Sequence, residues 1–167
     1  MSKRVFLPAI LVLLLLPSLT LRAQAPASAS EAAIKALYTK WNDAFNKKDV
    51  DTIMSLYAPD VFVYDVIPPR AYPSWDAYKK NWQDLFAQFP AVNNTVSDLH
   101  VTVVGPAAYT RFINSGTMTA KDGTQSHVVV RSTDVWRKID GKWLIVQEHN
   151  SVPVDLTTNK PDMLSTP

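Results

Sequence analysis

The chain has 167 residues with 17 basic and 15 acidic side chains, and it contains four glycines, three histidines and no cysteine. The absence of cysteine excludes disulfides, thiolate metal sites and cysteine nucleophiles, and the few glycines form no recognisable phosphate-binding loop. His100, His127 and His149 show no metal-ligand spacing, so the sequence predicts neither a metal site nor a cofactor.

The first 25 residues have the layout of a secretory signal peptide, with two basic residues before an apolar run at positions 5–16. The cleavage point stays open between Ala23 and Ala27, because Pro26 would directly follow a cut after Ala25. An uncleaved anchor is the alternative, although the run is short for the about 20 residues that span a membrane. We therefore expect a periplasmic or secreted protein with no stable membrane insertion after cleavage.

Removal of this leader would leave 14 basic against 15 acidic side chains. A mature chain without excess positive charge does not predict nucleic-acid binding. The remaining length suits one domain with a hydrophobic core. The predicted organisation is a signal peptide at 1–25, a linker at 26–30, a domain at 31–153 and a flexible tail at 154–167.

Three helices are predicted in the first half of the mature chain, since apolar side chains recur there three and four positions apart. Each begins at a residue suited to N-capping, and the second and third end next to a proline, which disfavours helix in the residue before it. Tyr57 is placed on the apolar side of the second helix. The predicted helices run from Ser28 to about Asn46, from Asp49 to about Ala58, and from Ser74 to Phe89.

A β-rich run at positions 61–66 separates the second and third helices and ends in a proline-rich segment. Later strand-like runs are joined by turn signals that contain glycine. Helices followed by an antiparallel meander indicate an α+β domain with the helices packed on one face of the sheet. The later strands are predicted at 96–104, 107–119, 125–138 and 142–151.

Alternation in the last two strands gathers polar groups on one face of the sheet, because successive strand side chains point to opposite faces. Unpaired acids on an apolar face are costly to bury, which indicates a functional site. This predicted inner face carries Val128, Val130, Ser132, Asp134 and Trp136 from one strand and Leu144, Val146, Glu148 and Asn150 from the next. The predicted outer face carries Val129, Arg131, Thr133, Val135 and Arg137.

Four segments, in the expected order, resemble the nuclear-transport-factor-2-like (NTF2-like) superfamily, which includes ketosteroid isomerase, SnoaL-type polyketide cyclases and the association domain of calcium/calmodulin-dependent kinase II. The segments are Trp41–Asp49, Leu56–Asp65, Thr133–Arg137 and Asp140–Ser151. The resemblance implies a cone-shaped fold with three N-terminal helices packed on a curved, mainly antiparallel sheet. Because this fold hosts many activities, the resemblance implies no single function.

Compared with ketosteroid isomerases, Asp65 resembles the carboxylate base that moves a proton next to a carbonyl, and Asp134 resembles the protonated acid that donates to the developing oxyanion. Trp41 stands where those enzymes place the oxyanion-hole tyrosine, and an indole N–H is a far weaker acid than a phenol. The kinase association domains carry arginines where Asn114, Asp134 and Asn150 stand here. The resemblance therefore implies an acidic, amide-lined pocket that does not suit carboxylate ligands.

The candidate catalytic residues are thus Asp65 and Asp134. Each has a structural alternative: Asp65 caps the loop after its strand, and Asp134 pairs with an arginine or lysine on a neighbouring strand. The aromatic candidates line a ligand cavity or form plain core, and the polar ones orient a ligand or form a rim at the sheet opening. The candidate ligand-binding residues are Trp41, Tyr57, Tyr64, Trp82, Phe112, Asn114, Trp136, Glu148 and Asn150.

The leading hypothesis is an exported protein that binds a small, largely apolar molecule between helices and sheet, with cofactor-independent acid-base chemistry of the isomerase, cyclase or lyase type. The alternative is a non-catalytic module that forms a homodimer or higher homo-oligomer, or binds a partner, through its outer sheet face. Apolar residues on that second face need cover, which is the basis of the alternative.

Overall fold

The computed structural model describes residues 27–165. The predicted signal peptide and most of its cleavage region lie outside these residues. Within the described part, no helix is long and apolar enough to cross a membrane. The helices are α1 (Ala27–Lys47), α2 (Val50–Met54) and α3 (Trp75–Gln88). The strands are β1 (Tyr57–Tyr64), β2 (Ala71–Tyr72), β3 (Ala91–Val104), β4 (Ala107–Thr119), β5 (Gln125–Ile139), β6 (Lys142–Ser151), β7 (Val154–Asp155) and β8 (Lys160–Pro161).

Two of the helices begin at their predicted caps. Asp49 Oδ1 and Ser74 Oγ each accept the backbone N–H of the residue three positions later, at 3.0 and 3.2 Å. These bonds satisfy N–H groups that the first turn of a helix leaves unpaired. The start of α1 differs from the prediction, because helix begins at Ala27 and takes up most of the expected linker at 26–30. That stretch is rich in alanine, the residue most favourable to helix.

The second helix is shorter than predicted, and Tyr57 belongs to β1 instead of α2. Helix α2 ends at Met54. Two residues later the Leu56 carbonyl accepts the backbone N–H of Ile145 in β6 at 2.8 Å. Pairing with a distant strand therefore overrides the local helical spacing, which contains no information on that partner.

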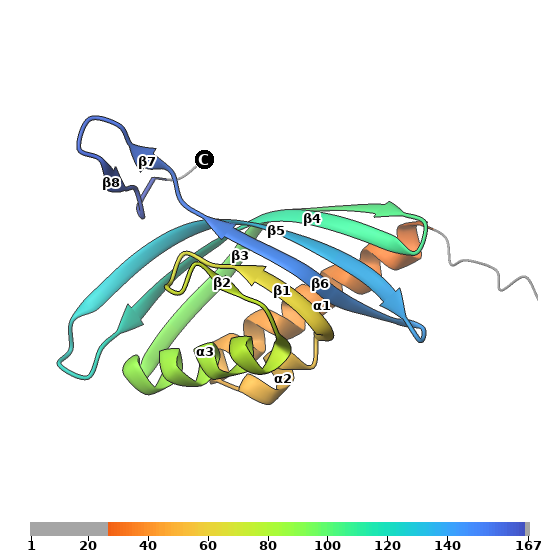
Figure 1. Ribbon diagram of the computed structural model, residues 1–167, viewed down its shortest axis with the longest axis horizontal. Helices are drawn as coiled ribbons and strands as arrows, with labels where there is room; N and C mark the ends of the chain where they lie inside the picture. The colour runs from red at the N-terminus through yellow and green to blue at the C-terminus, as the bar shows by residue number, and fades with distance from the viewer. Residues whose placement is uncertain (1–26, 166–167) are drawn as a thin grey trace, which may run out of the picture.

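Six strands form one sheet in the order β2-β1-β6-β5-β4-β3. All neighbours are antiparallel except β1 and β6, which run parallel. The α+β class and the antiparallel meander from β3 to β6 are confirmed, with β3 beginning at Ala91, earlier than predicted. Figure 1 shows the helices on one face of the curved sheet, where the hydrophobic core lies between the two layers.

A bulge in β6 changes which of its residues face the core. Val135 pairs with Gln147 and Trp136 pairs with Ile145, so Val146 is an extra residue in the ladder. As a bulge shifts the alternation by one position, Ile145 lies on the inner face together with Glu148. The prediction that Leu144 and Val146 share this face is therefore wrong, while the prediction for Glu148 is confirmed by its burial.

The C-terminal residues form a hairpin in place of the frayed tail that was predicted. Strands β7 and β8 pair with each other, and the backbone N–H of Val129 donates to the carbonyl of Met163 at 2.7 Å. Strand β5 extends beyond the end of its pairing with β6, so the tail accepts an N–H that β6 does not reach. Val129, predicted on the outer face, is only 6% exposed there. Figure 1 shows the hairpin beyond the end of β6.

Candidate functional site

A pocket with a volume of about 120 Å³ lies between the inner face of the sheet and the helices α1 and α3. Its walls are mainly apolar, and its polar groups are carboxyl and amide side chains. The pocket brings together residues far apart in the sequence, as a ligand site requires. The predicted site residues that line it are Trp41, Asp65, Trp82, Asn114, Glu148 and Asn150.

A second space of about 10 Å³, here called the deep cavity, adjoins the pocket. Trp41, Asn114 and Glu148 line both. The deep cavity has room for about one water-sized atom. The other predicted residues that line it are Tyr57, Phe112, Asp134 and Trp136.

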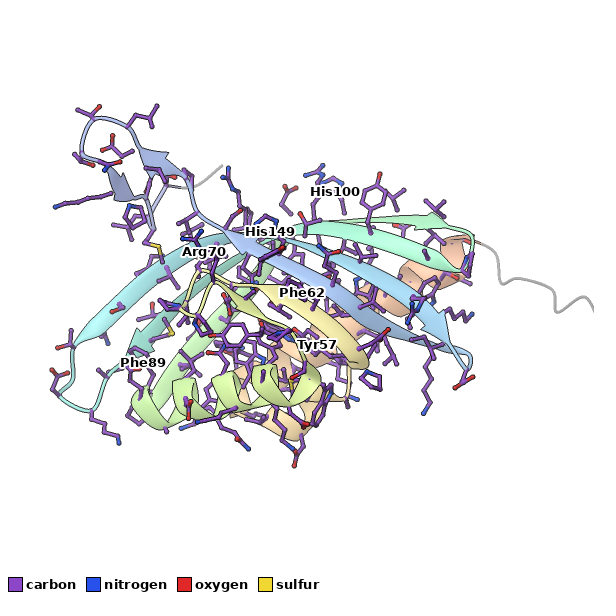
Figure 2. The ribbon with its side chains drawn as sticks, viewed as in Figure 1. Tyr57, Phe62, Arg70, Phe89, His100 and His149 are labelled. Carbon is purple, nitrogen blue, oxygen red and sulfur yellow. The ribbon has the colours of Figure 1, made fainter. Side chains whose placement is uncertain are left out.

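Tyr64 lies away from both cavities, which corrects its assignment as a ligand-binding residue. It is 42% exposed and packs edge-to-face against Phe62 and His149. In the register between β1 and β6, Tyr64 is paired with the exposed His149, whereas the buried Val63 is paired with the buried Glu148. Strand alternation therefore places Tyr64 on the outer face. Figure 2 shows Tyr57, by contrast, between the sheet and the helices.

Asp65 lies at the edge of the pocket, directly after β1. Its Oδ1 accepts the backbone N–H of Val66 at 2.7 Å, as the loop-capping alternative predicts, and its Oδ2 lies 3.5 Å from Asn81 Nδ2. Burial and the nearby charge of Glu148 raise the pKa of Asp65 to about 6. The loop-capping alternative is thus confirmed for Oδ1, while Oδ2 retains acceptor capacity toward the pocket.

Glu148 is buried and its carboxylate is fully provided with donors. Tyr57 donates to Oε2 at 2.6 Å, and Tyr78 and Asn150 donate to Oε1 at 2.7 and 2.6 Å. Burial raises the pKa of Glu148 above its usual range, while these three hydrogen bonds favour the charged form. Glu148 thus has more than the rim role that the sequence offered as its alternative, because it anchors two tyrosines and one amide beneath the pocket.

A chain of side-chain hydrogen bonds crosses four strands and ends at Glu148. Asn94 donates to Asn114 at 3.0 Å, Asn114 donates to Ser132 at 3.3 Å, and Ser132 donates to Asn150 at 2.5 Å. Asn150 then donates to Glu148. Every donor in this polar chain points toward the carboxylate, so the bonds polarise one another and stabilise negative charge on Glu148.

Asp134 belongs to a separate group of buried hydroxyls. Its Oδ2 accepts the Tyr38 hydroxyl, which also contacts Thr110 Oγ1 and accepts the Trp136 indole N–H at 3.2 Å. Among the described residues Asp134 makes no ion pair with arginine or lysine, so its structural alternative is wrong. Burial and the charge of Glu148 raise the pKa of Asp134 well above its usual range. Since Glu148 has three donors, we assign the charge to Glu148 and the proton to Asp134.

Three buried polar atoms have no hydrogen-bond partner among the described residues: the Nε1 atoms of Trp41 and Trp82, and Asp134 Oδ1. Trp41 and Asp134 both line the deep cavity. A buried polar group without a partner costs about 1–3 kcal/mol. An oxygen atom placed in the deep cavity would be a partner for both the indole N–H and the protonated carboxyl.

Several residues of the site were missed in the sequence. The sequence indicates Tyr38 as an aromatic that lines a cavity or forms core, and it lines the deep cavity. Tyr78 was missed, because it lies at a helical spacing typical of core and nothing local distinguishes a buried hydroxyl that bonds a carboxylate. Ser132 could have been found, because it shares a predicted face with Asp134. Asn94 precedes the predicted start of its strand, so its place in the polar chain was hidden. No group of three or more potential metal ligands exists among residues 27–165.

Met163 reaches the pocket from the C-terminal tail and forms part of its lining. We expect Met163→Ala to weaken the binding of an apolar ring by about 3- to 10-fold, since part of a methionine's burial energy of about 1.5–3 kcal/mol would be lost. Ligand titration monitored by tryptophan fluorescence measures this change. Leu164→Ala is the matched control, because Leu164 is 63% exposed and does not line the pocket. Equal losses in the two variants would contradict a specific role for Met163.

Comparison with known proteins places this geometry in a family context. A family model described as a SnoaL-like domain matches residues 34–155. A comparison with curated proteins finds no match. Among solved structures, an NTF2-like protein of unknown function from Pseudomonas putida KT2440 is 25% identical, with a TM-score of 0.76 over 84% of this chain and 99% of that chain.

Two further solved structures have the same fold. A protein provisionally named a calcium/calmodulin dependent protein kinase II association domain, from Xanthomonas campestris, is 26% identical, with a TM-score of 0.63 over 71% of this chain and 84% of that chain. A protein provisionally named a scytalone dehydratase, from Novosphingobium aromaticivorans DSM 12444, is 16% identical, with a TM-score of 0.70 over 83% and 97%. The resemblance drawn from the four sequence segments is confirmed.

Proposed function

Because the chain belongs to the SnoaL-like family, we propose that it binds a small, largely apolar carbonyl compound in a cone-shaped space between helices and sheet and transfers a proton next to the carbonyl. Asp65 is the base. The observation that carries this proposal is a carboxylate at the edge of an apolar pocket whose pKa is raised to about 6. Such a group is ionised at neutral pH and still basic enough to accept a proton.

The proposed step needs only side chains of this chain. The Asp65 carboxylate takes a proton from the carbon next to the carbonyl, and the electron pair of that C–H bond moves toward the carbonyl oxygen. That oxygen lies in the deep cavity, where Trp41 Nε1–H and protonated Asp134 donate to it. Asp65 then returns the proton to the same or to a conjugated carbon. The two unpartnered polar atoms of the deep cavity support this arrangement.

The size of the pocket limits the substrate. A cavity of 150 Å³ holds about one benzene ring, and the pocket has about 120 Å³. The buried part of the substrate is therefore about one ring in size. A four-ring steroid would project far beyond the pocket, which agrees with the absence of a tyrosine at position 41.

The test is deuterium exchange of the α-hydrogens of single-ring ketones in D₂O, followed by proton NMR. We expect the mature protein to accelerate exchange for at least one cyclic ketone or enone above the rate with heat-denatured protein. Exchange no faster than that background across a panel of five- and six-membered rings would overturn the proposed function. Tryptophan fluorescence titration of the same ketones separates a failure of binding from a failure of chemistry.

We further propose that the protein is exported, with residues 1–25 as its signal peptide. Two basic residues before the apolar run, and small residues around Ala25, support this. Intact-mass measurement of the protein from an exporting host gives the cleavage point. A mature chain whose first residue lies between Gln24 and Ser28 agrees with the proposal. A full-length chain contradicts it.

Assembly of two or more copies through the outer sheet face is also proposed. Tyr64 and Tyr109, on β1 and β4, are 42% and 50% exposed, and large aromatic side chains are enriched in protein interfaces. The Xanthomonas campestris protein named an association domain adds support at 26% identity. Light scattering at micromolar concentration tests this, and a monomer would contradict it. A dimer would be compatible with the proposed catalysis.

A further inference from the structure

The charge in and beside the pocket has one sign. The acidic side chains that line the pocket are Asp65 and Glu148. Asp134 lines the adjoining deep cavity. Among residues 27–165, no lysine, arginine or histidine lines either space. In the part of the chain that the structure describes, none of the three carboxyl groups takes part in a salt bridge. The site therefore has negative charge that the protein itself does not balance.

The polar chain beneath the pocket leaves Asp65 as the main acceptor for a ligand, because the amide oxygens of Asn114 and Asn150 already accept hydrogen bonds from within the chain. Asn114 and Asn150 direct amide N–H groups to Ser132 and Glu148. Asp65 Oδ2, by contrast, accepts only a long hydrogen bond of 3.5 Å from Asn81, although Asn150 and the backbone of Ile67 also lie close enough to favour the charged form of Asp65. A carboxylate oxygen that accepts only a long hydrogen bond favours a ligand that carries a strong hydrogen-bond donor.

An independent observation in the deep cavity points to a ligand as well. Asp134 is 1% exposed, and its Oδ1 has no hydrogen-bond partner among the described residues. Buried carboxyl oxygens are rarely left without a partner. Because Asp134 lines the deep cavity, a bound molecule is the natural source of that partner.

The apolar walls beside these acids are aromatic. Trp41, Phe45 and Trp82 line the pocket and pack against one another, with ring centroids 5.4 to 5.9 Å apart. The faces of aromatic rings attract cations, and tryptophan does so most strongly. Carboxyl groups and aromatic rings that line one pocket therefore suit a positive charge attached to an apolar group.

We propose that this pocket binds a small organic cation, namely a single ring that carries a protonated amino group. The ammonium group lies against Asp65, and the ring lies against the tryptophan and phenylalanine walls. This inference rests on the proposed function only in treating the pocket as a ligand site. A bound ammonium group and a reacting ketone would both use Asp65 Oδ2, and a nearby cation lowers the pKa of a carboxyl group, so the cation is a ligand that competes with the ketone and not a substrate of the proposed step.

Ligands of other charge fit less well. A carboxylate ligand would bring a further negative charge next to acids that have no counter-ion, in a site of low polarity. A neutral ring would gain the apolar contacts but would leave the charge of Asp65 unbalanced. The order of affinity that follows is cation, then neutral molecule, then anion.

The test uses three probes of nearly equal shape: benzylammonium, benzyl alcohol and benzoate. Their dissociation constants for the full mature chain are measured by isothermal titration calorimetry at neutral pH and constant ionic strength. We expect benzylammonium to bind at least about 10-fold more tightly than benzyl alcohol, and benzoate to bind least. Equal affinity for cation and alcohol, tighter binding of benzoate, or no binding of any probe would overturn the proposal.

A matched pair of variants locates the charge. Asp65→Asn should reduce the preference for benzylammonium over benzyl alcohol to about 3-fold or less, since the nearest carboxylate is neutralised. Asp60→Asn should leave the preference unchanged, because Asp60 lies on β1, five residues before Asp65, but is exposed and pairs with Arg137. Circular dichroism verifies folding, and benzyl alcohol affinity verifies an intact pocket. An unchanged preference in folded Asp65→Asn would overturn the placement of the ammonium group.

The outcome is separable from that of the proton-transfer assay. Tight binding of benzylammonium with no ketone exchange would support the cation site and overturn the proposed catalysis. Ketone exchange without any preference for benzylammonium would support catalysis and overturn the cation site.

Discussion

Asp65→Asn is expected to slow the exchange of ketone α-hydrogens by about 10²- to 10⁴-fold, the usual contribution of a positioned general base. An amide has nearly the shape of a carboxylate but cannot accept the proton at neutral pH. It can still accept the backbone N–H of Val66, so the loop after β1 stays in place. The affinity for a neutral ketone should therefore change little, and the loss should appear in the rate at saturation.

The same substitution is expected to stabilise the fold at neutral pH. A pKa raised from 3.8 to about 6 means that the folded chain holds this proton more tightly than the unfolded chain does. Stability from this group is thus fully present below about pH 4 and falls as the pH rises to about 6. A shift of this size corresponds to about 3 kcal/mol, which partial solvent exposure reduces to about 1–2 kcal/mol.

Urea denaturation at several pH values measures this effect. The wild-type protein should lose stability between about pH 4 and 6, and Asp65→Asn should lose less over that range and be more stable at neutral pH. Asp60→Asn is the control, and its exposed ion pair should change stability by less than about 0.5 kcal/mol. If the Asp65→Asn protein were less stable than wild type at neutral pH, or exchanged ketone α-hydrogens at the wild-type rate, the assignment of Asp65 as the base would be contradicted.

Glu148→Ala is expected to lower the free energy of unfolding by about 3 kcal/mol or more. The carboxylate accepts hydrogen bonds from Tyr57, Tyr78 and Asn150, and each donor left without a partner in a buried site costs about 1–3 kcal/mol. Loss of the side chain also leaves a space beneath the pocket, which adds to the cost. The effect is structural and should appear in thermal or urea denaturation without any ligand.

Glu148→Gln is the matched control for that loss. Glutamine keeps an acceptor for Tyr78 and Asn150, and its amide can donate to Tyr57, so the expected cost is about 1 kcal/mol or less. Removal of the charge also removes a cause of the raised pKa of Asp65. The pH midpoint of ketone exchange should therefore move below about 6 in Glu148→Gln. Similar destabilisation by alanine and glutamine would show that the hydrogen bonds of Glu148 contribute little.

The parts of the fold that local rules govern could be predicted from the sequence. Asp49 and Ser74 act within one helical turn of their own positions, so their caps were identified correctly. Tyr57 shows the limit of such rules, because a parallel strand more than eighty residues away decides its conformation. The folding of the tail onto β5 likewise depends on a pairing that no local pattern encodes.

The candidate site was predictable where alternation alone places a residue. Asp134 and Trp136 follow an unbroken ladder with β4, and both line the deep cavity. The prediction that Tyr64 binds a ligand was wrong, because Tyr64 is paired with His149 of β6, which faces outward. The hydroxyl contacts of Tyr38 and Tyr78 could not be predicted, since the acids that they contact lie 96 and 70 positions further along the chain.

The extra residue in β6 has a consequence for the comparison of relatives. Without Val146, Ile145 would be followed directly by Gln147, so the strand would alternate regularly and Glu148 would still face the pocket. If Val146 were instead kept and paired regularly with β5, Glu148 would change faces with its neighbour His149. A relative that is shorter by one residue at this point therefore keeps the same pairing with β5 and the same chemical group in the pocket. In an alignment of this family, a single gap at Val146 marks the loss of the bulge and no change in pocket chemistry, so residues on either side of the gap remain comparable.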